Sequence, residues 1–178
     1  MKVENKQAYR LLYPRLTVLV SSGSGDERDV MTVAWSTPIS FNPSLIGVSI
    51  SPKRYSYGVI ENTQKFAINI PTQEIAEETF FIGQKSGRDI DKFERTDLTP
   101  KSGETGVTII EECYANIECE LVDKPVYGDH TLFIGKVKNA EVKEDALKDN
   151  NFPDPKTGML YWMSSGNEEG YLSFRNSQ

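Results

Sequence analysis

Histidine and cysteine are scarce in this sequence of 178 residues, which has one histidine, His130, and two cysteines, Cys113 and Cys119. Because a zinc site takes three or four protein ligands, the lone histidine argues against one, and we predict no metal. The cysteines stand six positions apart on what reads as one strand, about 20 Å apart on one face, too far for a disulfide. We expect both to be small buried residues in a reducing cytosol, an expectation that the lack of a signal peptide supports.

Long apolar runs and an excess of positive charge are also missing. The longest apolar runs are only a few residues, too short to cross a bilayer. The 20 basic and 26 acidic residues give a formal net charge of -6, which repels polyanions. We therefore expect neither a membrane nor a nucleic acid as a partner.

Two common enzyme motifs are absent as well. The sequence has no Gly-x-Ser-x-Gly of the kind that presents a nucleophilic serine. It also has no Gly-x-Gly-x-x-Gly between a strand and a helix, so a Rossmann dinucleotide site is not supported.

What the chain does have is mostly β-patterned sequence, and its length predicts one domain, 1–178. A short helix is expected at 56–62 and a more regular one at 73–83. The polar segment 86–105 reads as a long loop, of a length that is usually either functional or disordered. Eight or so strands with one main helix predict a mainly β barrel, since closure removes exposed edges. The expected strands are 16–20, 30–37, 45–51, 66–70, 108–110, 114–123 and one or two within 130–145.

Two of these strand predictions are specific. The runs 30–37 and 45–51 are expected to form adjacent strands joined by a kinked link, because the segment between them holds two prolines and an asparagine. Strand 114–123 alternates apolar with polar residues, which predicts that Asn116, Glu118 and Glu120 face solvent.

Hydroxyl groups gather around a basic pair between residues 30 and 56. The hydroxyls come from strand ends, and they precede or follow Lys53 and Arg54, so together they could hold a phosphorylated ligand. Alternatively, the basic pair is a solvated surface pair and the hydroxyls lie on an open sheet face. The hydroxyl residues are Thr32, Ser36, Thr37, Ser49, Ser51 and Ser56.

Four ordered segments carry a resemblance to a known family: MTVAWSTPISFNPSLIGVSISPKRYS at 31–56, FAINIPT at 66–72, SGRDIDKF at 86–93 and GDHTLFIGKV at 128–137. On these segments the chain resembles the flavin reductase-like family of FMN-binding split-barrel proteins, particularly its flavoredoxin-type members. The resemblance implies a split β-barrel of Greek-key type with a few flanking helices. It also implies a homodimer with FMN near the subunit interface.

The resemblance also implies roles for individual residues. His130 would lie near the flavin and the nicotinamide entry face as the catalytic residue, although alone it reads as a turn residue. Taken alone, Trp35 reads as a core residue, and Arg88 and Lys92 read equally as members of exposed charge pairs. The implied FMN-binding residues are Thr32, Val33, Ala34, Trp35, Ser36 and Thr37 beside the ring system and ribityl chain, Ser49, Ser51, Lys53 and Ser56 around the phosphate, and Arg88 and Lys92 from the loop SGRDIDKF.

The implied function is an oxidoreductase that passes electrons from NAD(P)H, a transient co-substrate, through FMN to free flavin, ferric chelate or another acceptor. The alternative is a non-enzymatic FMN-binding electron-transfer protein that serves a protein partner. The segment after residue 144 departs from the resemblance, and it could complete the barrel, cover the partner's flavin or shape the substrate entry. We expect Tyr161, Trp162 and Tyr171 in it to be packing residues.

Overall fold

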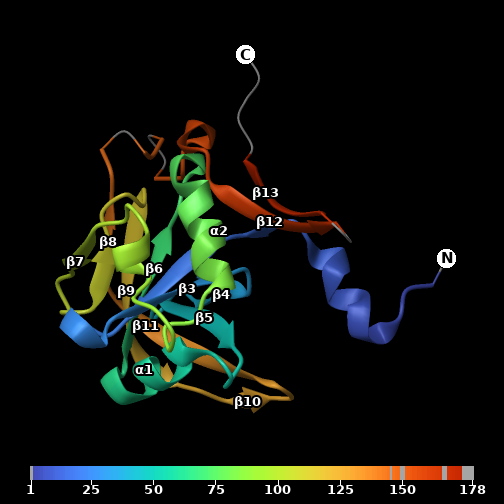
Figure 1. Cartoon of the computed structure of the whole chain (residues 1–178), viewed down its shortest axis with the longest axis horizontal. Coiled ribbons are helices and arrows are strands. Elements are labelled where there is room, and N and C mark those ends of the chain that lie inside the picture. Colours follow the sequence, from blue (N-terminus) through green and yellow to red (C-terminus); the bar gives the residue numbers. More distant parts are fainter. Residues whose placement is uncertain (1, 145, 149–150, 166–167, 174–178) are drawn as a thin grey trace.

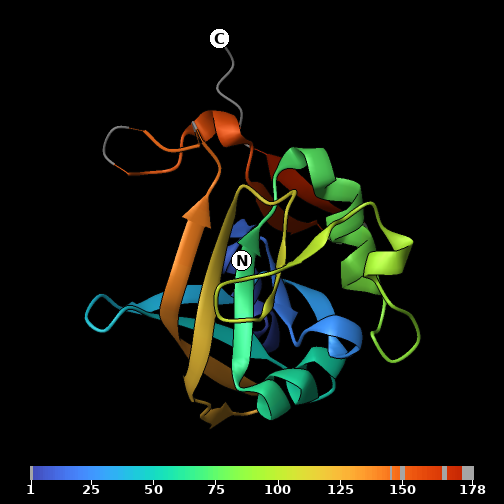
Figure 2. The ribbon, with the colours of Figure 1, turned by 90° about the vertical axis from the view of Figure 1, so that its left-hand side faces the viewer.

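The computed structural model describes residues 2–144, 146–148, 151–165 and 168–173. Its central feature is an eight-stranded antiparallel sheet that curls around an apolar interior, with two α-helices against it (Figures 1 and 2). The strands are β1 Arg15–Leu16, β2 Val18–Ser22, β3 Asp29–Val33, β4 Ser36–Ser40, β5 Leu45–Ile50, β6 Lys65–Ile70, β7 Pro100–Ser102, β8 Thr108–Ile110, β9 Ala115–Asp123, β10 Val126–Tyr127, β11 His130–Val142, β12 Leu160–Ser165 and β13 Glu168–Ser173. The helices are α1 Tyr55–Thr63 and α2 Ala76–Gln84, with the 3₁₀ helices η1 Asn5–Leu12, η2 Gly25–Glu27, η3 Gln73–Ile75, η4 Phe93–Arg95 and η5 Pro155–Thr157.

The curled sheet is open on one side. Its strands follow the order β3-β2-β6-β9-β11-β5-β4, with β10 paired to β11, and among the described strands β3 and β4 are its two ends. The run 30–37, expected as one strand, breaks after Val33, and its halves pair with different neighbours. The prediction that this whole run lies beside 45–51 is therefore correct for β4 and wrong for β3.

The long strand β11 holds the two halves of the sheet together. It pairs with β5 over residues 131–136 and with β9 over residues 134–142. The segment predicted to form one or two strands is therefore a single strand. Its register shifts next to Gly135, where an added Cβ would lie 2.5 Å from the Phe66 ring and 2.6 Å from Cys119 Cβ. Only glycine lets the bent strand approach the core this closely.

Two apolar clusters lie on opposite faces of the sheet. Val18 and Val20 of β2 point into the barrel with Phe66 and Phe133, whereas Leu19 between them packs outward with Ile82 of α2. Burial on both faces explains why this strand reads as a continuous apolar run. The two cysteines are buried and free, as predicted, but Cys113 precedes β9 and lies in the outer cluster, away from Cys119.

Strand β9 contradicts the prediction that its polar side chains face solvent. Asn116 is 5% exposed and Glu118 is 1% exposed. Glu118 accepts hydrogen bonds from the backbone N–H groups of Glu104 and Thr105, at 3.0 and 2.7 Å, because the β7–β8 hairpin covers this face. Glu120, further along the strand, is exposed as expected.

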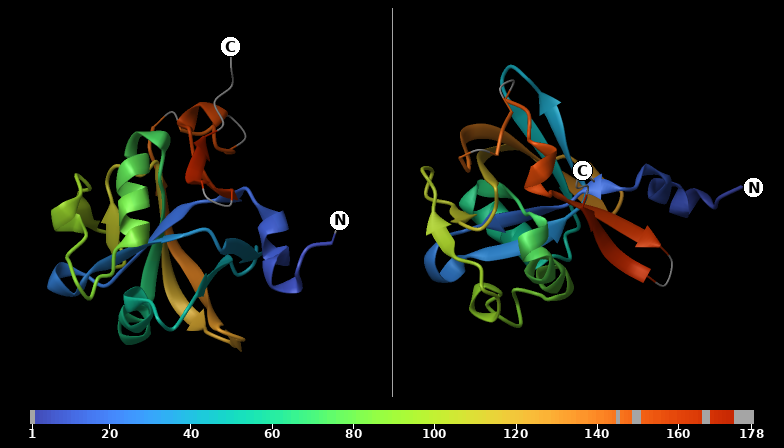
Figure 3. Two further views of the ribbon diagram at one scale, coloured as in Figure 1. Left: turned by 45° about the vertical axis from the view of Figure 1, so that its right-hand side comes forward. Right: turned by 90° about the horizontal axis from the view of Figure 1, so that it is seen from above.

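Strands from the N-terminal and C-terminal parts of the chain pair in a separate three-stranded sheet of order β1-β12-β13 (Figure 3). Arg15 pairs with Trp162, and the Thr17 N–H donates to the Leu160 carbonyl at 2.9 Å. The C-terminal segment therefore does not complete the barrel, one of the roles considered for it. The side chain of Tyr171 lies outside what the structure describes, so its predicted packing role stays a prediction.

Candidate functional site

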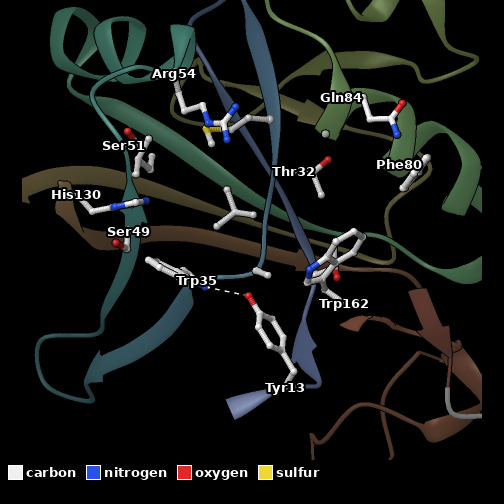
Figure 4. A pocket seen from close by; sticks show the side chains of 16 residues that line it. Tyr13, Thr32, Trp35, Ser49, Ser51, Arg54, Phe80, Gln84, His130 and Trp162 are labelled. Atoms are coloured by element: carbon white, nitrogen blue, oxygen red, sulfur yellow. Dashed lines mark hydrogen bonds between the residues drawn. The ribbon is translucent and has the colours of Figure 1, made fainter. Parts of the chain in front are cut away.

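A cavity of about 290 Å³ lies at the break between β3 and β4, where residues 34 and 35 line it (Figure 4). Its floor comes from the end of β3 and the crossing segment 34–35, one side from the end of β5, and another from the C-terminal end of α2. We call this cavity the aromatic compartment. Its lining residues are Tyr13, Thr17, Met31, Thr32, Val33, Ala34, Trp35, Ser49, Ile50, Ser51, Arg54, Phe80, Gly83, Gln84, His130 and Trp162.

Aromatic rings stand around this compartment in mutual contact. The centroids of the Trp35 and His130 rings are 4.9 Å apart, with the ring planes tilted by 38°. The Trp35 indole N–H donates to the Tyr13 hydroxyl oxygen at 3.3 Å, and Tyr9 of η1 meets the indole edge-on at 5.6 Å. Fixed rings of this kind favour a flat ligand, since aromatic faces pack on planar π systems.

His130 is oriented by its neighbour in the turn before β11. Its Nδ1 lies 2.7 Å from Asp129 Oδ1, and because a carboxylate only accepts, Nδ1–H is the donor. This hydrogen bond lowers the pKa of Asp129. It leaves Nε2 as the nitrogen available to a molecule in the compartment, toward which the ring extends (Figure 4).

A second cavity of about 260 Å³ adjoins the first, and we call it the basic compartment. It lies between the start of α1 and the loop 86–92, and five basic residues line it: Lys53, Arg54, Lys85, Arg88 and Lys92. The two compartments share five lining residues, so the cavities are direct neighbours. The shared residues are Met31, Thr32, Arg54, Gly83 and Gln84.

The loop 86–92 is held against the β5–α1 turn by direct contacts. An Arg88 guanidinium N–H donates to the Lys53 carbonyl at 2.9 Å, and the guanidinium carbon lies 5.9 Å from the centre of the Tyr55 ring. Arg28 pairs with Asp91 at 3.0 Å at the far end of the loop. These contacts bring Arg88 and the Lys53–Arg54 pair to one cavity within an acidic protein.

The structure brings most of the predicted site residues to these two compartments. Within the described chain, Ser36 and Thr37 lie on β4, outside the lining of both cavities. Others already have protein partners. The Thr32 hydroxyl donates to the Thr79 carbonyl at 2.6 Å, the Lys92 ammonium pairs with Asp29 at 3.1 Å, and the Ser56 hydroxyl also donates to Asp29. Thr32, Val33, Ala34, Trp35, Ser49, Ser51 and His130 line the aromatic compartment, and Thr32, Lys53, Ser56, Arg88 and Lys92 line the basic one.

Several lining residues were not among the predicted ones. Phe80, Gly83 and Gln84 share one face of α2, and their helical spacing is a signal that could have found them. Arg54 stands next to Lys53 and was recognised only as half of a basic pair. Tyr13 and Trp162 come from opposite ends of the chain and carry no local signal; Trp162, expected to be a packing residue, borders the cavity.

Other chemistries find little support among the residues that the structure describes. They contain no group of three or more histidine, cysteine, aspartate or glutamate side chains that could hold a metal ion. Burial raises the pKa of both cysteine thiols, that of Cys119 to about 12, which keeps them protonated. No described helix combines the length and the apolar character that a bilayer crossing requires.

Comparison with known proteins gives consistent results. Residues 9–168 match the family model described as "Flavin reductase like domain". An uncharacterized protein of Pyrococcus abyssi is 44% identical over 142 residues, 80% of this chain and 82% of that protein. The reductase component of an FADH(2)-dependent resorcinol hydroxylase from a Rhizobium species is 30% identical over 131 residues, 72% of this chain and 71% of that protein.

The fold is shared with solved structures. An FMN-binding protein from Thermus thermophilus, with bound 1-cyclohex-2-enone, superimposes with a TM-score of 0.86 at 28% identity, covering 100% of this chain and 97% of that one. The predicted fold, a mainly β split barrel with a few flanking helices, is confirmed.

Proposed function

This chain belongs to the flavin reductase-like family, and from that we propose that it binds FMN across the two adjoining compartments and passes electrons from NAD(P)H through FMN to an acceptor. The acceptor would be free flavin, a ferric chelate or another electron-accepting molecule. The observation that carries the proposal is that an aromatic cavity directly adjoins a basic one. FMN has the matching shape, since a flat ring system and a phosphate stand at its two ends.

The residues present fit this ligand. The ring system would lie against Trp35 and His130, and the phosphate would lie between Lys53, Arg54 and Arg88. Thr17 also borders the aromatic compartment, and its buried hydroxyl oxygen has no hydrogen-bond partner among the described residues. An unpaired buried hydroxyl favours a polar ligand atom nearby. Ser36 and Thr37 remain candidates only through the family resemblance.

The protein's own contribution is binding and orientation. FMN, when bound, supplies the electron-transfer chemistry, as flavins do generally. Trp35 and Tyr13 would hold its ring system, and Nε2 of His130 would be free to form a hydrogen bond with it. Arg54 lies where the compartments meet, so its charge acts on both ends of the ligand.

We propose further that the chain works as a homodimer in a reducing cytosol, with FMN near the subunit interface. The family resemblance supports the dimer. An interface near the pocket is supported by η1, because this helix carries exposed Leu11 and Leu12 and its Tyr9 packs on Trp35 of the aromatic compartment. Two free, buried cysteines suit a reducing compartment.

Anaerobic titration of the FMN-loaded protein with NADH and with NADPH tests the function. We expect the flavin absorbance to bleach with about one equivalent of at least one nucleotide, because hydride transfer to FMN takes two electrons. Steady-state oxidation of the same nucleotide should then rise when free flavin or a ferric chelate is added. Bound FMN that neither nucleotide bleaches would reject the NAD(P)H-dependent enzyme and leave the electron-transfer protein. A purified protein that binds no FMN would reject both.

A further inference from the structure

Three buried polar side chains meet beneath the basic compartment, and the proposed function does not use their contacts. Asp29 is 3% exposed, Lys92 is 4% exposed and Ser56 is 1% exposed. Asp29 Oδ1 lies 3.1 Å from the Lys92 ammonium, and the other carboxylate oxygen accepts a hydrogen bond from the Ser56 hydroxyl. The Lys92 ammonium also donates to the Val30 carbonyl at 2.5 Å.

These contacts join three segments that are far apart in the sequence. Asp29 begins β3, Ser56 lies in the first turn of α1, and Lys92 ends the loop that carries Arg88. The loop backbone touches the same carboxylate, since a Cβ added to Gly87 would lie 2.4 Å from Asp29 Oδ1. The Asp29 carboxylate therefore contacts both walls of the basic compartment, α1 through Ser56 and the loop 86–92 through Lys92 and Gly87.

The carboxylate adds no uncompensated negative charge below an anion site. Lys92 pairs with it at a buried position where water screens little, so the two charges largely cancel. Burial lowers the pKa of Lys92, and the charge of Asp29 opposes that shift. The exposed cations that remain to face an anion in the cavity are Lys53, Arg54, Lys85 and Arg88.

We propose that Asp29 is a positioning residue for phosphate recognition: through Ser56 and Lys92 it fixes the start of α1 and the loop 86–92, so that Arg88 and the Lys53–Arg54 pair converge on one phosphate. In this arrangement Lys92 holds the loop to Asp29 and does not bind the ligand. The inference rests on the proposed FMN site and deepens it. Asp29 itself does not touch the ligand.

The variant Asp29→Asn tests the inference by comparing FMN with riboflavin, which has the same ring system and no phosphate. The asparagine amide can still accept from Ser56 but turns a donor toward Lys92, which releases the loop. We expect the FMN dissociation constant to rise about tenfold or more, the scale of a lost charge-assisted contact. The riboflavin dissociation constant should change by less than about threefold. Flavin fluorescence quenching measures both.

The matched control is Asp89→Asn, an exposed carboxylate in the same loop. It makes the same charge change close to the pocket, so a purely long-range electrostatic effect would strengthen FMN binding in both variants. We expect Asp89→Asn to bind FMN as tightly as the parent or slightly more tightly. Equal FMN affinity in Asp29→Asn and the parent would overturn the positioning role.

A second variant covers the case in which Asp29→Asn does not fold because a buried ammonium has lost its counterion. Asp29→Asn combined with Lys92→Met removes both charges together, a change that buried ion pairs often tolerate. We expect this protein to fold, to bind riboflavin like the parent and to bind FMN weakly. Parent-like FMN binding, or equal losses for FMN and riboflavin, would refute the inference. A parent protein that binds neither flavin would instead refute the proposed function.

Discussion

At the scale of single residues, His130 is the polar side chain best placed to act on a ring in the aromatic compartment. Asp129 holds its Nδ1, Trp35 packs against its face, and Nε2 is left for the ligand. We expect His130→Ala to lower the rate of flavin reduction by NAD(P)H about 100-fold or more, in the range that a positioned general acid or base contributes. FMN affinity should fall less, because the phosphate contacts lie in the other compartment. Stopped-flow absorbance measures the rate, and fluorescence quenching measures the affinity.

Tyr127→Ser provides the control for this experiment. Tyr127 is 66% exposed in the strand just before the same turn, and it does not line either compartment among the described residues. This variant should reduce flavin at the parent rate. A His130→Ala protein with parent rates would remove the histidine from the reaction, whereas similar losses in both variants would point to damage to the turn.

The candidate site could be predicted from sequence only where its residues are neighbours along the chain. Thr32 to Trp35, together with Ser49 and Ser51, reach one cavity because two strands end beside each other. The basic pair with Lys53 suggested an anion site from the sequence itself, whereas Arg88 was assigned to the ligand through the family resemblance. Tyr13 and Trp162 could not be found in this way, since a pairing between β1 and β12 across the whole chain brings them together. Lys92 shows a different limit: its charge suggests an anion partner, but its burial next to Asp29 depends on tertiary packing.

At the scale of secondary-structure elements, Glu118 attaches the β7–β8 hairpin to the barrel. It accepts from the backbone of Glu104 and Thr105 and from the Asn139 side-chain amide at 3.0 Å. Glu118→Gln would place an amide donor among these donors. We expect it to lower the free energy of unfolding at about pH 7 by about 1 to 3 kcal/mol, the cost of a buried group left unsatisfied. Urea denaturation of the variant and the parent measures the difference.

The same carboxylate makes this difference depend on pH. Burial acts to raise the pKa of Glu118, but the hydrogen bonds from Thr105, Asn139 and Glu104 outweigh it, and the net pKa lies below its ordinary value of 4.5. A lowered pKa stabilises the folded state above pH 4.5, and this contribution is lost as the pH falls through the folded pKa. The gap between parent and variant should therefore narrow at about pH 3.5. A gap that stayed constant from pH 7 downward would show that Glu118 is not held as a carboxylate.

The strands also show how far sequence patterns determine the fold. Apolar runs identified β2, β5, β6, β8 and most of β9 and β11, because a buried strand face requires them. The alternation in β9 suggested exposure of Glu118 and was misleading, since a hairpin with little apolar sequence of its own covers that face. The break between β3 and β4 was missed because residues 30–37 favour strand throughout. The break is set by the curl of the sheet, which sends the two halves to opposite ends of the strand order.

At the scale of the whole molecule, the position of η1 bears on the proposed dimer. This helix extends away from the barrel and, in the described structure, buries none of its own residues (Figure 1). Leu11 is 71% exposed and Leu12 is 65% exposed, while Tyr9 in the same helix packs on Trp35 at the wall of the pocket. A second copy that covered the two leucines would therefore also hold Tyr9 against Trp35 at the aromatic compartment.

We expect sedimentation analysis to give twice the chain mass of 20.0 kDa. Changing Leu11 and Leu12 together to serine should weaken self-association, since burying each leucine contributes about 1.5 to 3 kcal/mol. FMN affinity should fall with it, because Tyr9 would lose its support against Trp35. The pair Val126→Ser and Tyr127→Ser, equally exposed at 67% and 66% on β10, is the control and should leave both properties unchanged. A leucine variant that stays dimeric would place the interface elsewhere, and one that becomes monomeric with parent FMN affinity would separate the interface from the pocket.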